Sequence, residues 1–329
     1  MSNPHLQTLF AQYDRADGLS LERQRIKVPL TDGDHVLLDS HKPVKLLEKV
    51  PLTLIIHGLS GSSESHYVLG LQKALSAMGW PSIAMNCRGA TSPNDRVRAY
   101  HAGASDDVIG VFNYLITVQE RPIVIVGYSL GGSMTLKSLA ELGNHPRLLG
   151  GVAVSTPLHL ASCADRLDRG FSRLYRKHLL SEMDSLWRNK LGFLQADGRH
   201  AEAAQIRSRL ATGPFSSFWD FDNRVMAPLH GYQDVHDYYA RCTPNQFLRQ
   251  IVVPTLVIHA KDDPFMQSSV VPQASELSPS IHFELSPTGG HVGFISGSLT
   301  RPIYYLEKRI PQFLSMLHLQ SDASLPCSQ

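Results

Sequence analysis

Short apolar runs alternate with longer segments of mixed character along the first half of the chain. Runs rich in Ile, Val and Leu predict strands at residues 52–57, 82–87, 123–126 and 148–155, with helix-forming segments at about 65–78, 104–119 and 130–142 between them. Two earlier segments, 24–30 and 35–39, predict an opening hairpin. This alternation predicts an α/β fold with a mostly parallel central sheet and helices on both of its faces.

The alternation stops after residue 155 and returns at Pro254. Residues 157–248 are polar and aromatic, with helical patterning at 164–183 and 201–210 and no long strand. From Pro254 the chain predicts two more strands, the second at 281–285, and a last helix over about 301–318. We therefore expect a core domain of residues 1–156 and 249–319, interrupted by a helical cap of residues 157–248. The polar residues 320–329 are expected to form a flexible tail.

The strand at 123–126 runs directly into Gly127-Tyr128-Ser129-Leu130-Gly131, and a helix-forming segment follows. A G-x-S-x-G sequence between a strand and a helix is typical of the nucleophile elbow, a sharp turn that lifts a serine hydroxyl above a parallel sheet. A serine at the apex of such a turn has a strained backbone, and bulky residues two positions away on either side would collide with it. We interpret Ser129 as a nucleophile.

A serine hydroxyl is a weak nucleophile until a histidine removes its proton, and a carboxylate must orient that histidine. In one known arrangement the order along the chain is Ser, then Asp or Glu, then His. His291 fits the last place, because it lies on a Gly-rich loop after the strand at 281–285. Each of the three positions follows a predicted strand, so they should meet at the carboxyl ends of the sheet.

The acid of this triad follows the strand that starts at Pro254, where Asp262 and Asp263 are adjacent. The acid usually stands three residues past the small residue that ends the strand, here Ala260, and this spacing favours Asp263. Asp262 is then a solvated or turn-capping carboxylate. If Asp262 held the role instead, the rest of the assignment would not change.

Two backbone N–H groups are expected to form an oxyanion hole. One belongs to Leu130, the residue after the nucleophile. The other is expected at Leu59, because the strand at 52–57 opens into His57-Gly58-Leu59, and a glycine lets the backbone aim its next amide at the substrate. His57 stands in the wrong place along the chain for a general base, so we expect it to brace this loop through its ring nitrogens.

Composition agrees with an ordinary enzyme of 329 residues, with 43% hydrophobic and 18% charged residues and a formal net charge of +2. That charge gives no reason to expect a nucleic-acid partner. We expect neither a signal peptide nor a transmembrane segment, and a cytoplasmic location. The cysteines, Cys87, Cys163, Cys242 and Cys327, lack the spacing of a zinc or redox site. No cofactor and no metal is expected.

An aromatic cluster in the expected cap suggests an apolar surface above Ser129. It includes Phe215, Phe218, Trp219 and Phe221. Phe218 and Trp219 are the two we assign tentatively to substrate binding. The alternative is that these aromatics pack the cap against itself and against the sheet.

Several segments together resemble the YheT-like branch of the α/β-hydrolases, a bacterial group similar to eukaryotic ABHD-type esterases and yeast medium-chain ethyl ester synthases. They span nearly the whole chain, from Asn-Pro-His-Leu-Gln-Thr at 3–8 and His-Gly-Leu-Ser-Gly-Ser-Ser-Glu-Ser-His-Tyr at 57–67 to Asn-Cys-Arg-Gly at 86–89, Gly-Tyr-Ser-Leu-Gly-Gly at 127–132, Asp-Asp-Pro at 262–264 and Gly-His-Val-Gly-Phe at 290–294. The resemblance implies an α/β-hydrolase fold and a serine hydrolase of carboxylic esters with the triad Ser129, Asp263 and His291.

Three functions fit these motifs. The first is an esterase for short to medium acyl chains, acting on a small-molecule or lipid-like ester through an acyl-enzyme. The second is an acyltransferase or thioesterase that uses the same triad. The third is a non-catalytic binding member of the fold, which the intact triad and oxyanion loops disfavour. The sequence does not address the physiological substrate or the oligomeric state.

Overall fold

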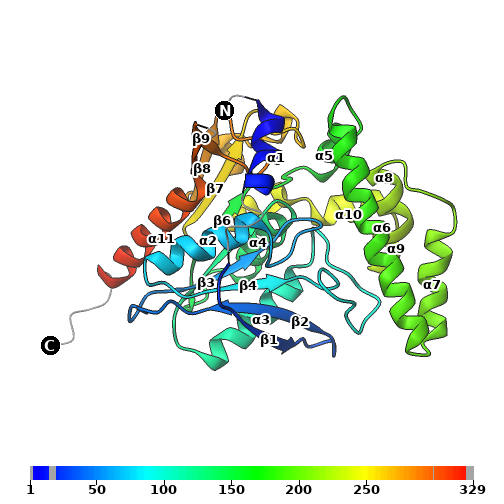
Figure 1. Cartoon of the computed structure of the whole chain (residues 1–329), viewed down its shortest axis with the longest axis horizontal. Helices are drawn as coiled ribbons and strands as arrows, with labels where there is room; N and C mark the ends of the chain where they lie inside the picture. Colours follow the sequence, from blue (N-terminus) through cyan, green and yellow to red (C-terminus); the bar gives the residue numbers. More distant parts are fainter. Residues whose placement is uncertain (1–2, 15–19, 299, 324–329) are drawn as a thin grey trace.

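An eight-stranded sheet forms the centre of the molecule in the computed structural model, which describes residues 3–14, 20–298 and 300–323 (Figure 1). The strand order is β1-β2-β4-β3-β5-β6-β7-β8. The six strands from β4 to β8 in this order run parallel, and β2 and β1 extend the sheet antiparallel. The expected mostly parallel sheet with an opening hairpin is therefore confirmed. The strand bounds are β1 Gln24–Pro29, β2 His35–His41, β3 Leu52–Ile56, β4 Ser82–Asn86, β5 Ile123–Tyr128, β6 Leu148–Val154, β7 Thr255–Ala260 and β8 Ile281–Ser286.

Helices cover both faces of this sheet. Helices α2 (His66–Ala77) and α11 (Leu306–Ala323) pack on one face, and α3 (Ser105–Val118) and α4 (Leu130–Leu142) on the other. Every residue of β3, β5 and β7 is buried as a result. Strands buried on both faces read as continuous apolar runs, which is why these strands could be predicted from the sequence.

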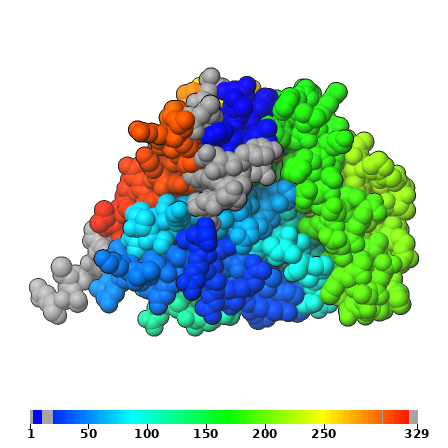
Figure 2. Space-filling model, viewed as in Figure 1, coloured from blue at the N-terminus to red at the C-terminus, as the bar shows by residue number. Residues whose placement is uncertain are grey.

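Further helices stand beside the sheet, between β6 and β7 in the chain, and form the right-hand part of Figure 1 and the green surface of Figure 2. Their bounds are α5 Leu160–Leu167, α6 Ser172–Ala196, α7 His200–Leu210, α8 Phe218–Phe221, α9 Ala227–Leu229 and α10 Val235–Cys242, with a π-helical turn at Asp222–Met226 and a 3₁₀ turn at Pro244–Gln250. The helical patterning expected at 164–183 corresponds to parts of two helices, α5 and α6, and is interrupted at residues 168–171. The chain turns between α5 and α6, where Gly170 has a φ of +53°, a conformation that glycine adopts without strain.

The expected last helix at 301–318 is also wrong at its start. Residues Arg301–Tyr304 form β10, which pairs antiparallel with β9 (Ile295–Ser298) in a separate two-stranded sheet, and α11 begins only at Leu306. Pro302, Ile303 and Tyr304 favour an extended backbone over a helix. Helix α11 continues to Ala323, so the first part of the expected tail 320–329 is helical, and residues 324–329 lie outside the described residues.

One helix was not predicted, α1 (Pro4–Asp14) near the amino end. The Asn3 side chain accepts hydrogen bonds from the amides of His5 and Leu6, at 2.9 and 3.1 Å, and Pro4 occupies the first helical position. Asn before Pro is a recognised start signal for a helix, so the sequence did carry this information. Among the helices described, none is long and apolar enough to cross a membrane.

Candidate active site

Ser129 stands at the apex of a strained turn between β5 and α4. Its φ of +51° and ψ of −118° lie outside the regions that non-glycine residues normally occupy. A Cβ on Gly127 would lie 2.2 Å from the carbonyl oxygen of Gly131, and a Cβ on Gly131 would lie 2.4 Å from that of His57. The two glycines of G-x-S-x-G therefore let the strand, the helix and the neighbouring loop come together beneath the serine.

The structure brings Ser129, His291 and Asp263 into one hydrogen-bonded chain. The Ser129 hydroxyl and His291 Nε2 are 2.9 Å apart, and His291 Nδ1 and Asp263 Oδ2 are also 2.9 Å apart. The Phe265 ring stacks on the imidazole with centroids 4.0 Å apart and 9° between the planes, which fixes the tilt of the ring. The geometry thus favours Asp263 over Asp262 as the partner of the histidine.

Asp262 is a partly exposed capping carboxylate, as expected, but it caps the loop before His291 and not its own turn. Its Oδ1 accepts hydrogen bonds from the amides of Gly289 and Gly290, at 2.8 and 2.9 Å. These two amides lie in the loop that carries His291. The two adjacent carboxylates therefore contact one loop in different ways: Asp263 bonds the imidazole and Asp262 bonds the backbone that precedes it.

The expected oxyanion amides lie next to amides that are already occupied. The Gly58 N–H donates to the Tyr67 hydroxyl at 3.0 Å, and the Ser60 N–H donates to the Tyr100 hydroxyl at 2.8 Å. The Leu59 amide between them forms no hydrogen bond with any residue in the described part of the chain, and neither does the Leu130 amide. Leu59 and Leu130 both line the same cavity as Ser129. Tyr67 and Tyr100 were not identified from the sequence.

His57 braces this loop, as expected. Its Nδ1 donates to the Gly58 carbonyl at 2.7 Å, and its Nε2 accepts from the Cys87 amide at 3.1 Å. Burial lowers the pKa of His57 to about 4, so the ring is neutral near pH 7. A neutral ring can donate at one nitrogen and accept at the other, which is what these two contacts require.

Helix α1 holds the loop of His291 from the other side. The His291 amide donates to the Thr8 hydroxyl oxygen at 2.9 Å, and that hydroxyl donates to the Pro4 carbonyl at 2.8 Å. The Ile295 amide donates to the Gln7 side chain at 2.7 Å. A Cβ on Gly293 would lie 2.1 Å from the Gln7 carbonyl oxygen, so the loop and the helix are in close contact. No pattern along the chain pointed to these contacts, because the partners lie 283 or more positions apart.

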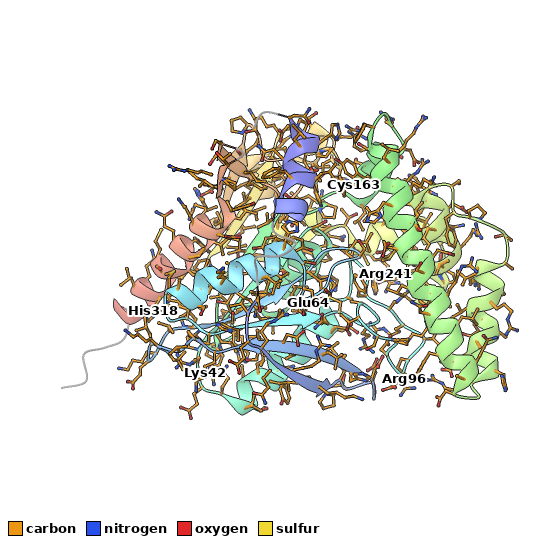
Figure 3. The ribbon with its side chains drawn as sticks, in the orientation of Figure 1. Lys42, Glu64, Arg96, Cys163, Arg241 and His318 are labelled. Carbon is orange, nitrogen blue, oxygen red and sulfur yellow. The ribbon has the colours of Figure 1, made fainter. Side chains whose placement is uncertain are left out.

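A cavity of about 880 Å³ lies above Ser129 and His291. Its wall combines the sheet edge with the helices between β6 and β7; Cys163 of α5 and Glu64 of the loop after β3 both line it, and Figure 3 labels both. Phe218 lines the cavity, whereas Trp219 is not among the lining residues. The Trp219 indole N–H donates to Asp165 at 2.9 Å and its ring packs on Tyr239, so the expectation that it contacts substrate is corrected.

Other reactive groups are accounted for by their surroundings. Burial raises the pKa of the Cys163 thiol, so it stays protonated and is a poor second nucleophile.

Asp34, His35 and Asp95 form the one cluster with metal-ligand chemistry among the described residues. Asp34 in that cluster already accepts hydrogen bonds from Arg88 and Asn94. We therefore interpret the cluster as part of an ion-pair network.

Comparison with known proteins finds relatives that are named as hydrolases, esterases or lipases. A family model described as alpha/beta hydrolase fold matches residues 51–298. The chain is 37% identical over 318 residues to the Escherichia coli (strain K12) protein YheT, covering 95% of this chain and 91% of YheT. It is 25% identical over 272 residues to Phospholipase ABHD3 of Mus musculus, covering 81% of this chain and 64% of that protein. A solved structure of the Pyrococcus furiosus esterase Pf2001 aligns with a TM-score of 0.58 and 15% identity over 92% of this chain and 93% of that one.

Proposed function

Because the chain belongs to the YheT-like α/β-hydrolases, an esterase-like family, we propose that it cleaves carboxylic esters of short to medium acyl chains through an acyl-enzyme on Ser129. The observation that carries this proposal is the hydrogen-bonded chain from Asp263 through His291 to Ser129 at the wall of a large, mainly apolar cavity. Family membership alone leaves the nucleophile and the substrate open.

In the proposed reaction His291 Nε2 takes the hydroxyl proton of Ser129 as the oxygen attacks the ester carbonyl. Asp263 accepts from Nδ1, which fixes the tautomer and stabilises the imidazolium that forms. The amides of Leu59 and Leu130 stabilise the negative oxygen of the tetrahedral intermediate. His291 then returns the proton to the leaving alcohol. A water molecule releases the acid by the same two steps, and Ser129 regains its proton.

The surroundings of each group support this assignment. The Leu59 amide lies between two amides that tyrosine hydroxyls already occupy, and it forms no hydrogen bond with the residues that the structure describes, so it is available for an oxyanion. The imidazole is stacked on Phe265 and bonded on both nitrogens, which leaves it little freedom to leave the attacking position. The helices of residues 157–248 supply Phe218, Tyr238 and Tyr239 to the cavity wall, and we propose that they act as its cap.

Acyl transfer to an alcohol would use the same acyl-enzyme and differs only in the acceptor. Thioester cleavage would likewise use the same groups. A non-catalytic role would leave the aligned triad without a purpose. An assay that follows both the free acid and any new ester in the presence of added alcohol separates hydrolysis from transfer.

The direct experiment is a series of p-nitrophenyl esters of increasing acyl length with the purified protein and its Ser129→Ala variant. We expect hydrolysis with an optimum at short to medium chains, and no more than a residual rate in the variant, because the attacking oxygen is gone. A variant that keeps most of its activity would remove Ser129 from the mechanism. Absence of hydrolysis across the whole series with the intact protein would remove the esterase assignment.

A further inference from the structure

Asp222 is a buried acid in the cavity wall that the proposed reaction does not use. It begins the π-helical turn Asp222–Met226, is 8% exposed and lines the same cavity as Ser129. Single π-helical turns within helical segments are uncommon and are found frequently at functional sites. This turn lies between α8 and α9, in the part of the chain that we propose as the cap.

The carboxyl group of Asp222 has one hydrogen-bond partner in the described part of the chain. The Tyr239 hydroxyl donates to Oδ2 at 2.7 Å, and neither a hydrogen bond to Oδ1 nor an ion pair to the carboxyl is present among these residues. Burial raises the pKa of Asp222 to about 7. Oδ1 is not one of the fully buried side-chain atoms that lack a partner among the described residues, so it is open to the cavity and can accept a hydrogen bond from a group bound there.

The other buried acids of this chain are held differently. Asp39 accepts from Arg25, Ser63 and Asn86, so both of its oxygens have partners. The Arg88 guanidinium bonds both oxygens of Asp107. Asp39 and Asp107 are thus paired at both oxygens, whereas Oδ1 of Asp222 has no partner among the described residues and Asp222 lines the cavity above Ser129.

Two further polar groups line the same cavity wall as Asp222. The Tyr238 hydroxyl accepts from the Ala102 amide at 3.1 Å, and its own proton has no acceptor among the described residues. His101 Nδ1 accepts from the Gly103 amide at 3.1 Å, and its Nε2 has no described partner. The His101 and Tyr238 rings are 5.6 Å apart, the Tyr238 and Tyr239 rings are 5.4 Å apart, and all three residues line the cavity.

We propose that Asp222, Tyr238 and His101 form a subsite that binds a hydroxyl group carried by the ester substrate, an inference that rests on the proposed esterase function. The subsite offers both donors and acceptors, and a hydroxyl group both donates and accepts. A plain alkyl chain would leave Asp222 Oδ1 and the Tyr238 proton unpaired. An ammonium group only donates, so it would leave the Tyr238 proton unpaired. The preferred substrate is thus an ester with a hydroxyl at a fixed distance from the reacting carbonyl.

Matched ester pairs test this subsite. One series compares p-nitrophenyl esters of straight-chain acids with their ω-hydroxy counterparts of equal length. A second series compares simple alkyl esters with hydroxyalkyl esters of one acid, because the hydroxyl can belong to either side of the ester. We expect the ratio of kcat/KM, hydroxy over plain, to reach about 10-fold or more at one chain length and to fall at longer and shorter ones.

Variants assign the preference to the proposed residues. Asp222→Leu should abolish the ratio, mainly by lowering kcat/KM for the hydroxy ester, and Asp222→Asn should keep part of it, because an amide still donates and accepts. Asp220→Asn is the matched control: this carboxylate lies two residues earlier, bonds Arg224 and the Ser216 amide, does not line the cavity, and should leave the ratio unchanged. Fluorophosphonate labelling of each variant reports whether the reacting serine is intact.

The outcomes separate this inference from the proposed function. A wild-type protein that hydrolyses plain and hydroxy esters equally at every length, in both series, overturns the subsite and leaves the esterase proposal standing. A preference that survives in Asp222→Leu also overturns it. A wild-type protein without activity on any ester refutes the proposed function itself. If Asp222→Leu does not fold, Tyr238→Phe must reduce the ratio, because it removes the hydroxyl that donates to the substrate; it also removes the acceptor of the Ala102 amide, so fluorophosphonate labelling must show that the reacting serine is intact.

Discussion

Single residues near Ser129 have roles that differ more than their positions suggest. Asp262 and Asp263 are neighbours in the chain, but one bonds the loop backbone and the other bonds the imidazole. Thr8, close to the amino end, bonds the amide of the residue that we propose as the general base. Position along the chain predicted the groups that we propose to react, and only the fold identified the residues that hold these groups in place.

The two aspartates should respond differently to substitution. Asp263→Asn should lower kcat by about 10⁴-fold, because the amide favours the wrong imidazole tautomer. Asp262→Asn should be mild, since an amide oxygen still accepts from the Gly289 and Gly290 amides. Asp262→Ala removes that acceptor and should cost up to about 10²-fold through misplacement of the histidine. Steady-state kinetics on one p-nitrophenyl ester measure all three, and equal losses in the two asparagine variants would contradict the division of roles.

Thr8 should act on turnover through the position of His291. Thr8→Val keeps the shape but removes the acceptor of the His291 amide, and we expect kcat to fall by about 10-fold with little change in KM, since geometry in the transition state is lost and binding is not. Thr8→Ser retains the hydroxyl and should restore kcat. A rise in KM alone, or a serine variant as poor as the valine variant, would show that the hydroxyl does not position the histidine.

Asp222 should make stability depend on pH. Its pKa in the folded protein is raised to about 7, from an ordinary value near 4, so the folded state binds more protons than the unfolded state between these values. The contribution of Asp222 to the free energy of unfolding therefore falls as pH rises across this window. Urea unfolding at pH 5 and pH 8 should show Asp222→Asn gaining stability relative to wild type at the higher pH. A difference between the two proteins that is equal at both pH values would contradict this assignment.

Helices and strands could be predicted where the residues of the element itself carry a clear hydrophobic pattern. Strands β3, β5 and β7 are buried on both faces, so their continuous apolar runs predicted them. The break between α5 and α6 was missed because helical patterning lies on both sides of Gly170. The hairpin β9-β10 was missed although Pro302, Ile303 and Tyr304 favour an extended backbone. Contacts with other parts of the fold determine the secondary structure of such segments, and the periodicity of one stretch of sequence does not reveal those contacts.

The helices between β6 and β7 should set the acyl-length preference. Phe218 lines the cavity, and the adjacent Trp219 packs within the helices instead. Phe218→Gln should flatten or shift the chain-length profile of p-nitrophenyl ester hydrolysis, because a polar side chain disfavours an apolar acyl group at that wall. Trp219→Phe, which keeps an aromatic ring, is the control and should leave the profile unchanged. An unaltered profile in Phe218→Gln would separate this part of the wall from substrate selection.

The molecule as a whole brings distant parts of the chain together around one cavity. Helix α1 lies beside the helices of residues 160–242, as the neighbouring blue and green surfaces in Figure 2 show, and it also contacts the His291 loop near the other end of the chain. The triad could be proposed from the sequence because each member follows a strand with a recognisable turn. Contacts between segments far apart in the chain form the cavity and the proposed subsite at Asp222, and they join α1 to the His291 loop. No local sequence pattern predicted these features.

Covalent labelling with a fluorophosphonate, followed by digestion and mass spectrometry, tests most directly whether this cavity is a serine hydrolase site. We predict one adduct on wild-type protein, on the Ser129 hydroxyl, a large loss of labelling rate in His291→Ala, and no adduct at this position in Ser129→Ala. Folded wild-type protein that stays unlabelled, or an adduct on a different residue that persists in Ser129→Ala, would contradict the account.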